Sequence, residues 1–139
     1  MLDFESQNVE HPDFDTAKMF RWITAVAGEH DRRIGPVSYR FCNDDDILEA
    51  NRKFLGHDYY TDIITFDYSR GDKIGGDILI SLDTVASNAK EMGVPYEEEL
   101  RRVIIHGILH LCGINDKGPG EREIMEAEEN KALAIWDTI

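Results

Sequence analysis

From residue 100 to residue 111 the sequence is apolar on nearly every face that a helix would present. A surface helix carries one apolar stripe, whereas a helix that is apolar all round must be covered by protein on every side. Pro95 and the acidic residues 97–99 favour a helix start just before this segment, and Gly113 is suited to its end. The sequence therefore predicts one central, buried helix around which the other elements pack.

The rest of the chain predicts further helices interspersed with strands. Apolar residues recur at helical spacing in the N-terminal third and in the C-terminal segment, where we expect Phe20 and Ile124 to belong to the apolar faces. Runs of β-branched and aromatic residues indicate strands. The expected helices cover about residues 13–28, 44–55, 83–93, 95–111 and 121–136, and the expected strands cover residues 2–4, 37–42, 63–68 and 77–81.

The order of these elements indicates the fold class. Gly35-Pro36 is expected to break the chain before the strand at 37–42. The turn-forming residues 69–72 join the next two strands as a hairpin, so the sheet cannot be purely parallel. No repeat, low-complexity run or long linker divides the 139 residues. We predict one small α+β domain over residues 1–139, in which helices cover a mixed β-sheet.

The charge of the chain restricts what it can bind. Fifteen basic and 28 acidic residues give a net charge of −13, which excludes a protein that holds nucleic acid through bulk positive charge. An anionic substrate must then be held by a local patch or by a bound cation. Two cysteines are too few for a disulfide framework, and neither a signal peptide nor a membrane span is expected. These features predict a cytoplasmic protein with reduced thiols.

Three residues at the end of the central helix form a candidate metal site. His106 and His110 are four residues apart, so both imidazoles lie on one helix face and can reach the same cation. Three residues beyond Gly113, Asp116 can offer a carboxylate as third ligand. Two His and one carboxylate, with one position left to water, is the arrangement of a catalytic zinc site. Cys112 is the other nearby donor, but it lies roughly 200° around the helix from His110 and is expected to be a buried small residue.

Other interpretations of these residues remain open. A lone buried His is usually a core residue with a hydrogen-bond partner, and Asp116 can also be a capping residue, in which case Glu121 or Asn115 would be the third ligand. We expect His11 and His30 to be surface residues. The residue after the first His is Gly107, whereas zinc peptidases of the H-E-x-x-H type place their general base there. A peptidase is therefore disfavoured.

The motifs resemble those of the YbeY-type endoribonucleases of bacteria. Residues 106–113 (HGILHLCG) follow the beginning of the family signature H-G-x-L-H-L-x-G-Y-D-H. Upstream, residues 61–66 (TDIITF) resemble the strand T-D-V-L-S-F, and residues 76–81 (GDILIS) resemble the strand G-D-I-x-I-S. Met125, Glu129 and Leu133 resemble the spacing of the closing helix. The resemblance extends over about residues 35–136.

This resemblance implies a zinc-dependent endoribonuclease with one Zn²⁺ per chain that cuts single-stranded RNA. It implies a role in maturation of ribosomal RNA precursor, at the 3′ end of the 16S species, and in ribosome quality control, with small-subunit ribosomal proteins as further partners. His106, His110 and Asp116 would be the metal ligands. In the family the third ligand is normally His, so Asp116 is a departure that makes the site less cationic.

A second departure concerns substrate binding. The family commonly carries Arg at the position of Leu55, and a leucine cannot clamp a phosphate. Arg52, Lys53 and His57 are nearby candidates for that role. The general base is not identified by the sequence, and Asp62 has the alternative reading of a turn or capping residue. Two other functions stay open, a zinc metallopeptidase and a non-catalytic ribosome-assembly factor.

Overall fold

The computed structural model describes all of residues 1–139 and contains a four-stranded sheet and five helices. The elements follow one another as β1 (Leu2–Ser6), α1 (Thr16–Glu29), β2 (Arg33–Cys42), α2 (Asp44–Leu55), β3 (Ile63–Asp67), β4 (Lys73–Ser81), α3 (Leu82–Met92), α4 (Tyr96–Leu111) and α5 (Glu121–Trp136). The predicted small α+β domain is confirmed. None of the helices is both long and apolar enough to cross a bilayer.

The sheet is mixed, as the hairpin predicted. Its strand order is β1-β2-β4-β3, with β2 parallel to both β1 and β4 and with β3 antiparallel to β4. The register pairs Ile64 with Leu79 and Thr65 with Ile78. Residues paired directly across two strands point to the same side of the sheet, so Thr65 shares the face of Ile78. The strand β3 lies at one edge of the sheet, and this edge borders the site described below.

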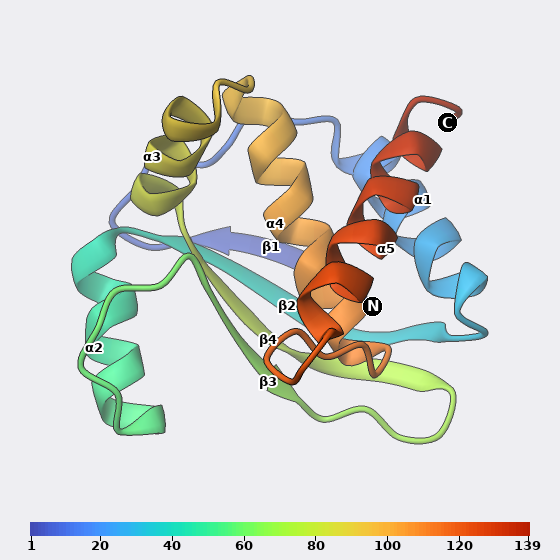
Figure 1. The fold of residues 1–139 in the computed structure, drawn as a ribbon, viewed down its shortest axis with the longest axis horizontal. Helices are drawn as coiled ribbons and strands as arrows, with labels where there is room; N and C mark the ends of the chain where they lie inside the picture. Colours follow the sequence, from blue (N-terminus) through green and yellow to red (C-terminus); the bar gives the residue numbers. More distant parts are fainter.

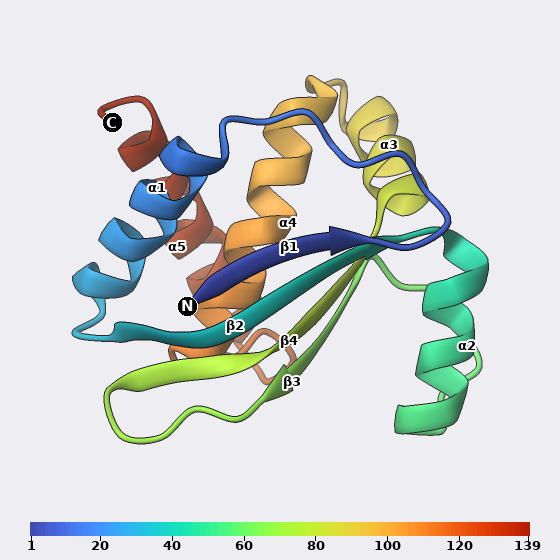
Figure 2. The same ribbon diagram turned by 180° about the vertical axis from the view of Figure 1, so that it is seen from behind.

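Helices cover the two faces of the sheet unequally. Figure 1 shows α1, α3, α4 and α5 on one face, and Figure 2, seen from behind, shows the sheet in front of α1, α4 and α5, with α2 beside one end. The large core lies under the first group and includes Tyr39, Ile78 and Ile104. A small cluster, which includes Ile47 and Ile64, lies under α2.

Helix α4 is the central element, as predicted, but it is not covered on every side, since Arg102, His106 and His110 are only partly buried. Nine of its residues are buried, and the Tyr39 hydroxyl of β2 donates a 2.7 Å hydrogen bond to the Ile104 carbonyl. Gly107 faces the sheet, where an added Cβ would lie 2.9 Å from the Cδ1 of Ile78 and 3.2 Å from the Cδ1 of Ile63. The glycine therefore allows α4 to pack closely against β3 and β4.

The ends of the helices follow their local chemistry. Asn43 caps α2 by accepting a hydrogen bond from the Asp46 N–H, and Gly56 ends that helix in the left-handed region at φ 67°. Ser81 caps α3 in the same way. Asp44 ties the two helices together, because its Oδ1 accepts from the hydroxyls of Ser81 and Thr84.

Three expectations about the fold were wrong. Gly35-Pro36 does not precede β2 but lies inside it, where the pairing with β4 shifts register between Ile34 and Val37. A sheet accommodates a proline at such an irregularity, since no ladder hydrogen bond is required there. Phe20 and Ile124 are exposed by 44% and 57%, so both lie outside the core, although Met19 and Met125 beside them are buried.

Candidate active site

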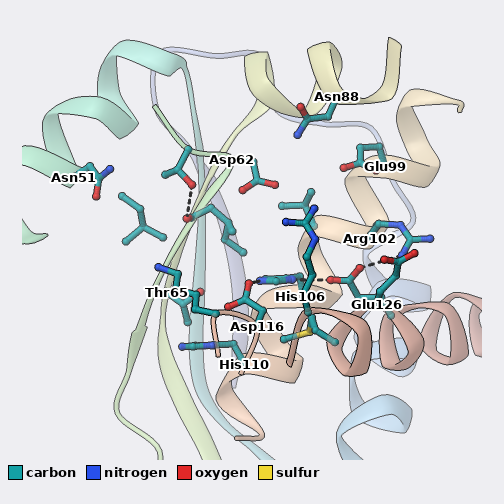
Figure 3. A pocket seen from close by; sticks show the side chains of 18 of the residues that line it. Asn51, Asp62, Thr65, Asn88, Glu99, Arg102, His106, His110, Asp116 and Glu126 are labelled. Atoms are coloured by element: carbon teal, nitrogen blue, oxygen red, sulfur yellow. Dashed lines mark hydrogen bonds and ion pairs between the residues drawn. The ribbon is translucent and has the colours of Figure 1, made fainter. Parts of the chain in front are cut away.

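A pocket of about 630 Å³ opens at the edge strand β3. Its walls come from α2, β3, α3, α4, α5, the segment that follows α2 and the loop between α4 and α5. His106, His110 and Asp116, the three predicted ligands, all line it. Figure 3 shows His106 and Asp116 next to each other, with His110 below them. The pocket therefore contains all three residues that the sequence predicted as metal ligands.

The imidazole of His106 is held from two sides. Its Nδ1 lies 2.6 Å from Oε2 of Glu129, which is on α5, and its Nε2 lies 3.3 Å from Oδ2 of Asp116. The other carboxylate oxygen of Glu129 accepts a 3.0 Å hydrogen bond from Nη1 of Arg102. The second guanidinium nitrogen, Nη2 of Arg102, donates to Oδ1 of Asn130. This network orients the ring so that Nε2 faces the pocket.

The electrostatics of His106 reflect these contacts. Burial lowers the pKa of His106, but the hydrogen bond and the negative charge of Glu129 raise it, and the charges of two more carboxylates add to that effect. The net pKa of His106 is above its ordinary value. The surroundings of this ring therefore favour a positive charge, whether a proton or a bound cation supplies it.

The three predicted ligands are only partly brought together. His106 and Asp116 are in contact, whereas no group of three His, Cys, Asp or Glu side chains is arranged to hold a metal ion. His110 lines the same pocket one helical turn away. Gly113 turns the chain after α4 with φ 95°, as its position in the sequence suggested, and Asp116 follows it back over the helix end.

The donor chemistry nevertheless fits a divalent cation. Two imidazoles and one carboxylate are ligands that Zn²⁺ accepts. In addition, a metal-bound His usually donates its second ring N–H to a carboxylate, which fixes the tautomer and the orientation of the ring. Glu129 makes that contact with Nδ1 of His106 and leaves Nε2 directed towards Asp116.

The alternative donors near this site have other environments. Cys112 is 7% exposed, and burial raises the pKa of its thiol to about 11, as expected of an unreactive buried cysteine. The carboxylate of Glu121 accepts a hydrogen bond from the Gly118 N–H, and neither Glu121 nor Asn115 lines the pocket. His11 is exposed, whereas His30 is half-buried and pairs with Glu128.

Several residues of the pocket were missed by sequence reasoning. Glu99 and Arg102 were not identified, although they precede the predicted His106 and His110 at a spacing of three to four residues along one face of α4, and this spacing was the available signal. It was hidden because the apolar residues between them dominate the pattern. The pairing of His106 with Glu129 joins residues 23 positions apart, and no local spacing predicts it.

Leu55, His57 and Tyr59 form one rim of the pocket. Leu55, at the position where the family has Arg, lines it and is 43% exposed. Two of the nearby candidates to replace that Arg, Arg52 and Lys53, do not line the pocket. Arg52 is paired with Asp58. His57 is in the wall, stacked on the Tyr59 ring at a centroid distance of 5.1 Å. The exposed cations Arg122 and Lys117 also line the pocket.

Comparison with known proteins places this arrangement in a family. The family model described as Endoribonuclease YbeY matches residues 1–137. Proteins named Endoribonuclease YbeY are 62% identical in Phocaeicola vulgatus, over 97% of this chain and 98% of that protein, and 58% identical in Bacteroides fragilis, over 96% of each. The protein with that name in Porphyromonas gingivalis is 49% identical, over 96% of this chain and 89% of its own length.

A solved structure agrees with these matches. The solution structure of a Thermotoga maritima protein is similar with a TM-score of 0.65 and 25% sequence identity, over 99% of this chain and 93% of that chain. The family resemblance inferred from the motifs is confirmed. Because the family model and the relatives match practically the entire chain, this protein belongs to the YbeY family of endoribonucleases.

Proposed function

We propose that this protein is a zinc-dependent endoribonuclease that cuts single-stranded RNA. The observation that carries the proposal is the position of His106, held between Glu129 and Asp116 in the pocket of a chain from an endoribonuclease family. In the cell the substrate would be ribosomal RNA precursor in the cytoplasm, with roles in 16S 3′-end maturation and in ribosome quality control.

One Zn²⁺ per chain would be held by His106, His110 and Asp116. When bound, zinc supplies a Lewis acid for a phosphate oxygen and lowers the pKa of a bound water towards ~7. The contact between Glu129 and Nδ1 of His106 supports this assignment, since it selects the tautomer that a metal ligand requires. Arg102 holds Glu129 in turn, so the ring position depends on two helices at once.

Two exposed cations are the groups that we assign to the RNA phosphate. Arg122 and Lys117 line the pocket of a protein whose net charge is −13. Arg102 also lines it, but its guanidinium is already engaged by Glu129 and Asn130. Arg122 can form the paired hydrogen bonds with phosphate that Leu55 cannot.

The preference for single strands rests on the rim of the pocket. The rings of His57 and Tyr59 are stacked, and Tyr59 is 50% exposed. Stacking of a base on an aromatic ring requires an unpaired base and gains free energy without positive charge. An acidic protein can therefore hold single-stranded RNA at this rim with only a few phosphate contacts.

Gly107 disfavours the metallopeptidase. A glutamate there would have to project towards Ile78 and Ile63 of the sheet, where even a Cβ is closer than ordinary contact. The general base of the H-E-x-x-H peptidases has no place at this position. The non-catalytic assembly factor is separated from the nuclease by the experiment below.

The test is cleavage of a labelled single-stranded RNA by the pure zinc-loaded protein, with and without chelator. We expect cleavage that is lost on chelation and is reduced about 1000-fold in His106→Ala, since several kcal/mol of transition-state stabilisation are removed. The metal content of His106→Ala, measured by elemental analysis, should fall well below one zinc per chain.

The matched control is His11→Ala, which removes an exposed His outside the pocket. It should keep both the cleavage rate and the metal content. Binding of RNA without any cleavage would overturn the nuclease and favour the assembly factor. Undiminished zinc in both His106→Ala and His110→Ala would overturn the ligand assignment.

A further inference from the structure

Glu99 is a buried carboxylate in the wall of the pocket that the metal site does not use. It lies in the first turn of α4, is 4% exposed, and its Oε1 is buried without any hydrogen-bond partner. Most buried polar groups in proteins are hydrogen-bonded, and an unpaired buried carboxylate is expensive. A side chain kept in this state beside a pocket is expected to meet its partner in a ligand.

The charges around Glu99 do not satisfy it. Burial raises the pKa of Glu99, and the positive charge of Arg102 opposes this effect without a direct hydrogen bond. The negative charges of Asp62 and Glu129 raise the pKa further. The carboxylate is therefore short of hydrogen-bond donors, and a ligand that brings N–H groups would stabilise it.

Glu99 also lies apart from the candidate metal ligands. Figure 3 shows Glu99 and Asn88 at one end of the pocket, while His106, His110 and Asp116 are at the other. Asp62 faces the space beneath Asn88 in the same view. Two carboxylates repel a phosphate, so the part of an RNA strand that enters this end is a base.

We propose that Glu99, with Asn88 of α3 in the wall of the same pocket, forms a subsite that recognises a guanine base. The Watson–Crick edge of guanine has two adjacent N–H donors, N1–H and the N2 amino group, followed by the O6 acceptor. A carboxylate accepts two parallel N–H groups, and the Asn88 amide can donate to O6. Reading of this edge in unpaired bases is a common mode of RNA recognition.

The other bases fit the carboxylate less well. Adenine and cytosine each place a ring acceptor beside their amino group, and uracil has one N–H between two carbonyls. Each would bring a lone pair towards the negative charge of Glu99. A good bidentate contact discriminates among bases by roughly tenfold or more. The pattern of donors and acceptors therefore favours guanine over adenine, cytosine and uracil.

This inference rests on the proposed function, because it takes RNA as the ligand. It adds a direction to the bound strand: a guanine lies at the Glu99 end, and the phosphate to be cut lies towards His106. The result is a nuclease with a preferred base near the cleavage point, although the chain lacks the positive charge for tight backbone binding.

The experiment measures binding of GMP, IMP and AMP to the full-length metal-free protein by titration of backbone amide NMR signals. We expect GMP to bind about tenfold more tightly than AMP, with IMP between them because it keeps N1–H but lacks the amino group. Signals of residues 88 and 99 should shift most. Equal affinity for GMP and AMP would overturn the proposal.

The decisive variant is Glu99→Gln, which keeps the size of the side chain and removes its charge. It should lower GMP affinity towards the level of AMP and should not weaken AMP binding, because the neutral amide no longer repels the ring acceptor of adenine. Glu97→Gln removes the same charge at an exposed position of the same turn and should change neither. A second variant, Asn88→Ala, should weaken GMP binding but not AMP binding. Equal losses for both nucleotides in Glu99→Gln would contradict base recognition.

The same ligands separate this inference from the function it rests on. If the protein cuts RNA but shows no preference for guanine in the position of its cuts, the subsite is wrong and the nuclease stands. If GMP binds through Glu99 but no RNA is cut, the nuclease is wrong and the nucleotide subsite stands.

Discussion

The two faces of helix α4 differ in composition and in packing. The face towards the sheet is apolar and closely packed, with Ile104 fully buried and with Gly107 in contact with Ile78. The face towards the pocket is polar along its length, from Glu99 through Arg102 to His106 and His110. One helix therefore supplies both the centre of the core and one wall of the candidate active site.

The difference shows where rigidity is needed. His106 is flanked in the sequence by Ile105 and Gly107, which are both buried. A ring carried by a helix that is fixed in the core keeps its position, and active-site groups held within a fraction of an ångström are the more effective ones. Packing on one face thus positions the chemistry on the other.

The largest stability effect is expected on the sheet face. Ile104→Ala deletes most of a fully buried side chain and should lower the free energy of unfolding by about 2–5 kcal/mol, measured by urea denaturation. Ile124→Ala, the same change at an exposed position of α5, should alter it by about 0.5 kcal/mol or less. Similar losses of stability in the two variants would contradict the conclusion that the sheet face of α4 is core and that Ile124 is on the surface.

Substitution of two helix glycines tests the close packing of the sheet face, with a smaller expected change in the free energy of unfolding. An alanine in place of glycine favours a helix by up to about 1 kcal/mol, but overpacking of a core costs about 1–3 kcal/mol. Gly107→Ala places its methyl group 2.9 Å from Ile78, so destabilisation of about 1 kcal/mol is expected. Gly28→Ala in α1 meets no atom within 4 Å and should be stabilising. Thermal unfolding of both variants measures the two signs, and a more stable Gly107→Ala would show that α4 does not need the close approach.

The smallest effect is expected on the pocket face and depends on pH. Burial raises the pKa of Glu99 from its ordinary value of 4.5, so the protonated form is favoured in the folded state. Ionisation of Glu99 therefore weakens the fold as the pH rises above that ordinary value. Glu99→Gln should be more stable than the parent at pH 7, by about 1 kcal/mol, and equal to it well below pH 4.5.

Denaturation at several pH values measures this difference. Glu97→Gln is the baseline for a change of charge in the same turn, since Glu97 is exposed. A stability gain in Glu99→Gln that persists at low pH would show that the charge of Glu99 is not its cause.

Much of the fold could be predicted from the residues because it rests on local chemistry. The caps at Asn43 and Gly56, the hairpin of β3 and β4 and the end of α4 near Gly113 follow from side chains close in the sequence. The position of Gly35-Pro36 inside β2 could not be predicted, because the neighbouring strand permits the irregularity and is more than 30 residues away.

The candidate site divides in the same way. The spacing of four residues between His106 and His110 predicts a metal site, and the glycine after His106 disfavours a peptidase. The groups around His106 depend on how α5, and the loop between α4 and α5, pack against α4. Glu129 reaches the ring from α5 and Asp116 reaches it from that loop. Periodicity and capping depend on neighbours along the chain, whereas the partners of a buried imidazole depend on how distant helices pack, and only the tertiary structure contains that information.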